Sequence, residues 1–145
     1  SNNVRGLFSN HGGTPTTPSA DDSIYDNKIF SSRVLFDSNS IAIYGERTML
    51  VDDSTFKDND TAFLMRGLNK HRVTNSTFEG NTLAVNVNSW WPNFPGYLSA
   101  PYLNAVITGN DFTDNTTAIK MYAYHNNILT QVGANVSNNI WDEAG

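Results

Sequence analysis

Seven residues spaced along the chain carry side chains that could bind or act on a sugar. They combine aromatic rings, one carboxylate, two cations and two amides: Tyr44, Glu46, Arg66, Asn86, Asn88, Lys120 and Tyr122. An insertion that starts at Trp90 and Trp91 adds further aromatic side chains. Flat aromatic rings beside amides suit the apolar face and the hydroxyl rim of a sugar ring. The residue types therefore predict a carbohydrate-binding surface, with these substrate-binding residues: Tyr44, Glu46, Asn86, Asn88, Trp90 and Trp91.

Two other interpretations remain open for the same residues. The Trp90 loop could fold back and cover apolar surface, or it could contact a neighbouring chain. Arg66 and Lys120 could serve only to keep one face of a sheet soluble.

A repeated phrase surrounds these residues and predicts the elements that position them. The phrase has an aromatic residue, an Asn three positions later, and an apolar residue four positions after the Asn. It occurs as Phe36–Asn39–Ile43, Phe56–Asn59–Phe63, Phe78–Asn81–Val85 and Phe112–Asn115–Ile119. The aromatic residues are 20, 22 and 34 positions apart, and the longest interval contains the Trp90 to Tyr102 insertion. A repeat of about twenty residues is typical of a solenoid. With Leu7–Asn10 and Asn139–Trp141 included, we expect about six coils.

Short alternating runs such as residues 84–87 predict strands, because side chains two positions apart share one face. Stacking the coils at the ~4.8 Å strand spacing would bury the apolar faces as continuous columns. If Ile24, Ile43, Phe63, Val85 and Ile119 face inward, two outward columns follow. The first is Tyr25, Tyr44, Leu64, Asn86 and Lys120, and the second is Asn27, Glu46, Arg66, Asn88 and Tyr122.

The recurring Asn has a structural explanation. Asn tolerates tight turns, and its amide can bond to the amide one coil away. We therefore expect a buried ladder of Asn39, Asn59, Asn81 and Asn115. Of the glycosylation sequons at Asn75, Asn115 and Asn135, the one at Asn115 would then be inaccessible.

Two segments, residues 73–85 and 107–119, resemble the coil of the right-handed parallel β-helix superfamily, which includes pectate lyases and polygalacturonases. The resemblance covers nearly the whole chain. It implies an all-β, right-handed parallel β-helix with Phe and Asn ladders and a secreted or cell-surface location. The length indicates a single domain over residues 1–145, which could be a fragment of a longer solenoid.

The resemblance also implies candidate catalytic roles. Lyases of this superfamily that act on acidic polysaccharides need a cation, a base and often an acid. Arg66 could neutralise a uronate, Lys120 could act as the base, and Tyr122 or His125 could donate a proton. Polygalacturonases instead place paired Asp residues in the turn before the strand. Only Asp60 matches here, so hydrolysis by paired carboxylates is not expected.

The composition of the chain argues against several classes of partner and cofactor. The net charge of −5 argues against a general nucleic-acid binder, and no apolar run is long enough for a membrane span. Cysteine is absent and the three histidines are far apart, so no transition-metal site is predicted. Calcium at Asp52–Asp53 is conceivable, although no loop spacing supports it. No other cofactor is expected. The basic cluster of residues 70–72 predicts a solvated turn.

Neither end of the chain shows an amphipathic helix that could cap a solenoid, which predicts end-to-end or homo-oligomeric stacking unless the chain is a fragment. The leading hypothesis is a domain that binds or processes a polysaccharide along the outward columns. If it is catalytic, lyase or epimerase chemistry on an acidic polysaccharide is expected. The alternative is a non-catalytic structural or adhesive solenoid, such as a surface protein or a phage-fibre segment.

Overall fold

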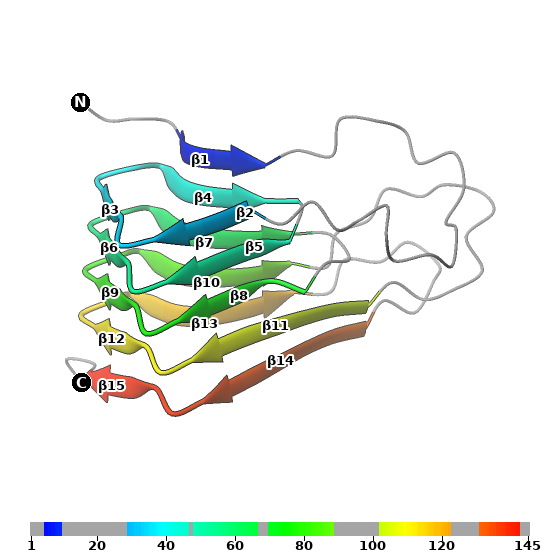
Figure 1. Ribbon diagram of the computed structural model, residues 1–145. Coiled ribbons are helices and arrows are strands. Elements are labelled where there is room, and N and C mark those ends of the chain that lie inside the picture. Colours follow the sequence, from blue (N-terminus) through cyan, green and yellow to red (C-terminus); the bar gives the residue numbers. More distant parts are fainter. Residues whose placement is uncertain are drawn as a thin grey trace.

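The chain folds as a solenoid of parallel strands (Figure 1). The computed structural model describes residues 5–9, 29–46, 48–66, 70–88, 102–122 and 131–142. Within these residues there are fifteen strands in three sheets of five strands each, and there is no helix. The all-β, parallel β-helix fold predicted from the repeat is therefore confirmed.

Each sheet collects one strand from successive coils. Sheet A consists of β1 (Arg5–Ser9), β4 (Ile41–Gly45), β7 (Thr61–Arg66), β10 (Leu83–Asn88) and β13 (Thr117–Tyr122). Sheet B consists of β2 (Ile29–Ser32), β5 (Met49–Asp52), β8 (Arg72–Thr74), β11 (Tyr102–Thr108) and β14 (Gln131–Ser137). Sheet C consists of β3 (Leu35–Asp37), β6 (Thr55–Lys57), β9 (Thr77–Glu79), β12 (Asp111–Thr113) and β15 (Ile140–Asp142).

Four complete coils, β2–β4, β5–β7, β8–β10 and β11–β13, lie between two incomplete ones in the described part of the chain. Strand β1 precedes them, and β14 and β15 follow them. The fifteen described strands therefore amount to about five coils, against a predicted count of about six.

The first strand of sheet A differs from the one that the sequence predicts. Strand β1 pairs with β4, so that Leu7 is in register with Ile43 and Phe8 with Tyr44. The predicted columns instead began at residues 24–27, which lie outside the described residues. The repeat was too irregular here to choose between the two segments, because both offer an apolar residue followed by an aromatic one.

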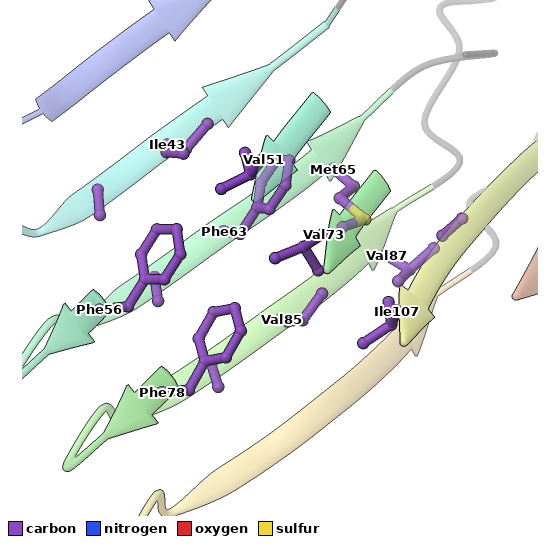
Figure 2. Close-up of a cluster of buried hydrophobic side chains, with 14 of the residues drawn as sticks. Ile43, Val51, Phe56, Phe63, Met65, Val73, Phe78, Val85, Val87 and Ile107 are labelled. Carbon is purple, nitrogen blue, oxygen red and sulfur yellow. The ribbon is translucent and has the colours of Figure 1, made fainter. Parts of the chain in front are cut away.

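Stacked aromatic rings form one wall of the core. Ring centroids in the series Phe36, Phe56, Phe78, Phe112 and Trp141 are 4.6 to 4.9 Å apart, with interplanar angles of at most 11°. Figure 2 shows Phe56 and Phe78 stacked, with Val51, Val73 and Ile107 from sheet B filling the interior beside them. Stacking one aromatic residue per coil keeps this column dry, because each ring covers the next.

The expected asparagine ladder is present. The side-chain amides of Asn39, Asn59 and Asn81 each donate to the Oδ1 atom of the Asn one coil further on, at 2.9 Å, and the series ends at Asn115. The backbone N–H groups of the same residues donate to the same oxygen atoms, at 2.9 to 3.0 Å. The ladder thus satisfies buried amide groups at the turn between sheets C and A.

A second ladder, which the sequence analysis did not predict, lies at the turn between sheets B and C. It runs through Ser54, Ser76, Asn110 and Asn139. The backbone N–H of each of the first three donates to the side-chain oxygen one coil further on, at 2.9 to 3.1 Å. Serine and asparagine share this column because each offers one oxygen acceptor at the same height. The change of residue type hides the repeat in the sequence.

Both turns use a left-handed residue in every described coil. The turn between sheets B and C has positive φ at Arg33, Asp53, Asn75, Gly109 and Asn138, and the turn between sheets C and A has it at Ser38, Asp58, Gly80 and Asp114. Asp, Asn and Gly tolerate this conformation best, which explains why these residue types dominate the turns.

Candidate functional site

Most of the predicted site residues lie together on the outward face of sheet A. Tyr44, Leu64, Asn86 and Lys120 are in register across β4, β7, β10 and β13, and so are Arg66, Asn88 and Tyr122 across the last three of these strands. Glu46 follows β4 directly. Met65 and Val87, which alternate with these residues, are fully buried on the inward face. We call the eight outward residues the outward strip: Tyr44, Glu46, Leu64, Arg66, Asn86, Asn88, Lys120 and Tyr122.

Tyr44, Glu46 and Arg66 form a hydrogen-bonded triad at one end of the outward strip. The Tyr44 hydroxyl donates to Glu46 Oε1 at 2.5 Å, and Arg66 Nη1 donates to the same hydroxyl oxygen. Arg66 Nη1 lies 3.8 Å from Glu46 Oε1, and the guanidinium carbon is 5.6 Å from the centre of the Tyr44 ring. The triad therefore combines an ion pair, a shared hydroxyl and a cation–π contact.

The triad is largely withdrawn from solvent. Tyr44 is 7% exposed although it lies on the outward face. The side chains of Arg66 and Glu46 are 24% and 21% exposed. Burial, assisted by the hydrogen bond to Glu46, raises the pKa of Tyr44 above its ordinary value, so the hydroxyl keeps its proton at neutral pH. Tyr44 is accordingly a hydrogen-bonding group here rather than a base.

Asn86 and Asn88 lie on β10 beside the triad. Both residues keep part of their surface exposed, but their Oδ1 atoms are buried. Neither oxygen accepts a hydrogen bond. A buried acceptor without a donor is unfavourable, and native proteins have few of them. A ligand would meet the two amides at the edges that remain exposed.

Lys120 and Tyr122 are exposed on β13, at the other end of the outward strip. Strand β10 separates them from Arg66, so that two strand spacings, about 10 Å, lie between the backbones of β7 and β13. The cation, base and acid that the resemblance implies are thus spread along the strip rather than gathered at one point. The other predicted residues, Trp90, Trp91 and His125, lie outside the described residues.

His71 differs from the sequence prediction. The basic cluster was expected to be a solvated turn, and Lys70 and Arg72 are indeed exposed, but His71 is fully buried. Its Nδ1 accepts from the backbone N–H of Met49 at 3.4 Å, and its Nε2 is 3.0 Å from the carbonyl oxygen of Arg66. Alternation with the buried Val73 was the signal that could have placed His71 inside.

The Asp52–Asp53 pair, considered above for calcium, contacts neighbouring protein groups. Asp52 Oδ1 accepts from Thr74 Oγ1 at 2.7 Å and from Asn75 Nδ2 at 2.9 Å, and these hydrogen bonds lower the pKa of Asp52. Asp53 Oδ2 is 3.3 Å from Arg33 Nε. The two carboxylates therefore bind neighbouring protein groups. No cluster of three or more His, Cys, Asp or Glu residues suited to a metal occurs in the described ranges.

The comparison with known families agrees with this architecture. The family model for the right-handed β-helix region matches residues 5–143, and the chain belongs to that family. Neither a curated protein nor a solved structure matches the chain. The described residues also contain no helix that is long and apolar enough to cross a membrane. Because one β-helix architecture can host many functions, the function has to be argued from the outward strip.

Proposed function

We propose that the chain is a carbohydrate-binding β-helix domain whose ligand lies along the outward strip. The carrying observation is the alignment of sugar-compatible side chains in register on four neighbouring strands of sheet A. Residues in register repeat at the strand spacing of ~4.8 Å, which is comparable with the length of one sugar ring. A polysaccharide that runs along the solenoid axis could therefore meet one coil after another. A ligand of this kind is typical of the extracellular environment, so a secreted or cell-surface location is part of the proposal.

The strip offers both kinds of contact that sugar rings use. Leu64 lies between Tyr44 and Asn86 and is partly exposed, so it provides an apolar position for a ring face. Asn86 and Asn88 supply amide groups, and Tyr122 adds an aromatic ring that is 47% exposed. The arrangement favours binding over turnover, because Arg66 already has a carboxylate partner and lies two strands from Lys120.

Affinity electrophoresis through gels that contain pectic, alginate, glycosaminoglycan and neutral plant polysaccharides tests this proposal. We expect at least one polymer to retard the wild-type chain and Asn86→Ala and Asn88→Ala to reduce the retardation. Thr77→Ala is the matched control, because it lies in the same coil but on the outward face of sheet C. If no polymer retards the chain, the proposed function is wrong.

A lyase can be recognised in the same samples. Elimination from a uronic acid polymer produces an unsaturated sugar, which absorbs ultraviolet light. Growth of this absorbance that disappears in Lys120→Ala would assign Lys120 as the base and would make the domain an enzyme. From the spread of Arg66, Lys120 and Tyr122 along the strip, we expect retardation without turnover.

A structural solenoid that stacks end to end is the second candidate. It is favoured by apolar side chains on the last described strands, because Met121, Val136, Ile140 and Trp141 are all between 41% and 64% exposed. An exposed apolar patch of this kind is typical of a contact between chains. In this case, Ile140→Ser should lower the oligomer mass measured by light scattering, and Asn86→Ala should leave it unchanged.

A further inference from the structure

The charge of Arg66 is the first feature that bears on which glycan would bind. Arg66 is the cation that a uronate would meet at the triad, and Lys120 is the other cation of the strip, on β13. Its Nη1 atom lies 3.8 Å from Glu46 Oε1, and both groups contact the Tyr44 hydroxyl. The Glu46 carboxylate therefore occupies the position of an anionic ligand group. An acidic sugar arriving beside Arg66 would also approach the negative charge of Glu46.

The side-chain amides of β10 also bear on which class of glycan would bind. Asn86 Oδ1 and Asn88 Oδ1 are acceptors that lack donors, and Asn88 is in register with Arg66. A sugar hydroxyl can donate to an amide oxygen, whereas an ionised carboxylate has no donor. Rotation of an amide about its last side-chain bond would exchange its oxygen and nitrogen and bring the acceptor to the other edge of the group. In that orientation the amide oxygen would face solvent, where a sugar hydroxyl could donate to it.

Leu64 completes this arrangement. It separates Tyr44 from Asn86 in the register and places an apolar side chain, rather than a second cation, next to Arg66. Besides Tyr44, the part of the strip formed by β4, β7 and β10 therefore carries one positive and one negative charge in contact, two amides and one apolar side chain. Among the described residues of the strip, the other cation is Lys120, which lies on β13, one strand beyond Asn86 in the register.

We propose that the outward strip is selective for neutral, hydroxyl-bearing polysaccharides, and that Glu46 is the residue that excludes acidic ones. This inference rests on the proposed carbohydrate-binding function. It assigns Arg66 to the organisation of the triad, and it assigns the hydroxyl contacts to Asn86 and Asn88. The selectivity would be the opposite of what a uronate-binding cation at Arg66 would give.

The test uses pairs of polymers that share a backbone and differ in charge. Hydroxyethyl cellulose is paired with carboxymethyl cellulose, and fully methyl-esterified homogalacturonan with its de-esterified form. Affinity electrophoresis gives an apparent dissociation constant for each polymer. We expect the wild-type chain to bind the neutral member of at least one pair about tenfold more tightly than the anionic member. Binding of the neutral member should change little with added salt, because no charge is neutralised.

Glu46→Gln tests the assigned residue. It removes the negative charge, keeps the size of the side chain and leaves the charge of Arg66 unbalanced. This variant should gain affinity for the anionic polymer, and that gain should decrease as salt is added. The double variant Glu46→Gln/Arg66→Gln restores neutrality and should restore the preference for the neutral polymer. Its melting temperature, compared with that of the single variant, shows whether an altered fold contributes.

The outcomes separate the two proposals. A wild-type chain that binds the anionic member of each pair more tightly overturns the selectivity and leaves carbohydrate binding intact. A folded Glu46→Gln variant with an unchanged preference overturns the role of Glu46. Absence of binding to every polymer by every variant refutes the proposed function, and the selectivity with it.

Discussion

The Nε2 atom of His71 lies 3.0 Å from the carbonyl oxygen of Arg66. This contact joins a fully buried side chain to the backbone of a residue whose own side chain lies on the outward face of sheet A. Because Nδ1 accepts from the N–H of Met49, the proton of the neutral ring is on Nε2 and donates to Arg66. Protonation of the ring at Nδ1 would keep the bond to Arg66 and would remove the acceptor of the Met49 N–H.

This contact predicts how stability varies with pH. Burial lowers the pKa of His71 from 6.5 to about 4, and the hydrogen bond to the Arg66 carbonyl only partly opposes the effect. Between these two pH values the unfolded chain takes up a proton that the folded chain does not. The stabilisation is fully present above pH 6.5 and is lost as the pH falls towards about 4. At about 1.4 kcal/mol per pKa unit, the loss should be roughly 3 kcal/mol.

Urea unfolding at several pH values measures this loss, with His71→Gln as the control. The variant should be less stable at neutral pH, because the amide fills the site less well, but its stability should change less between neutral pH and pH 4. Parallel curves for the two proteins would contradict the assignment, since other groups would then account for the pH dependence.

The aromatic column predicts a large effect at its centre. Phe78 is fully buried between Phe56 and Phe112, so Phe78→Ala removes two stacking contacts and leaves a cavity. We expect a loss of about 3–5 kcal/mol in the free energy of unfolding. Leu35→Ala, on the outward face of the same sheet and 63% exposed, should change it little. Urea unfolding curves that coincide for the two variants would show that the column is not a packed core.

Asn81 supports its ladder in two directions. Its Oδ1 accepts from the backbone N–H and the side chain of Asn59, and its Nδ2 donates to the carbonyl of Phe56 and to Asn115 Oδ1. Asn81→Ala leaves buried partners of these bonds unsatisfied, and we expect it to destabilise the chain by about 2–3 kcal/mol. Asn135→Ala, at an exposed position on β14, is the matched control. Thermal unfolding of both variants measures the difference, and a loss at Asn81 no greater than at Asn135 would refute the ladder as a source of stability.

Much of the fold could be predicted from the sequence, because Phe and Asn repeat without substitution in the coils of residues 36–119. Alternation from Ile43, Phe63, Val85 and Ile119 was then sufficient to place the outward residues on one face. The column of Ser54, Ser76, Asn110 and Asn139 escaped detection because its shared property is an acceptor oxygen rather than a residue type.

The internal contacts of the site were harder to predict than its position. Tyr44, Glu46 and Arg66 could be assigned to neighbouring strands, but their mutual hydrogen bonds depend on how long side chains bend over the sheet. Sequence alone suggested that Arg66 was available to a uronate. In the structure Glu46 is next to it, because both residues lie near the end of the same outward register. The class of ligand that we propose therefore depends on the ion pair between Arg66 and Glu46, and not only on which residues lie on the surface.

Gly45 provides a last test of how the core supports the outward strip. It is buried on β4, in register with Met65, and a Cβ atom there would lie 2.5 Å from Met49 Cγ and 3.1 Å from His71 Cε1. Gly45→Ala should therefore displace Met49 and His71, and we expect it to destabilise the chain by about 1–3 kcal/mol. Met49→Ala also destabilises but removes the closer of the two obstructing atoms. In a double-mutant cycle measured by urea unfolding, the two losses should be less than additive by about 1 kcal/mol or more. Full additivity would mean that the space beside Gly45 is not filled by Met49.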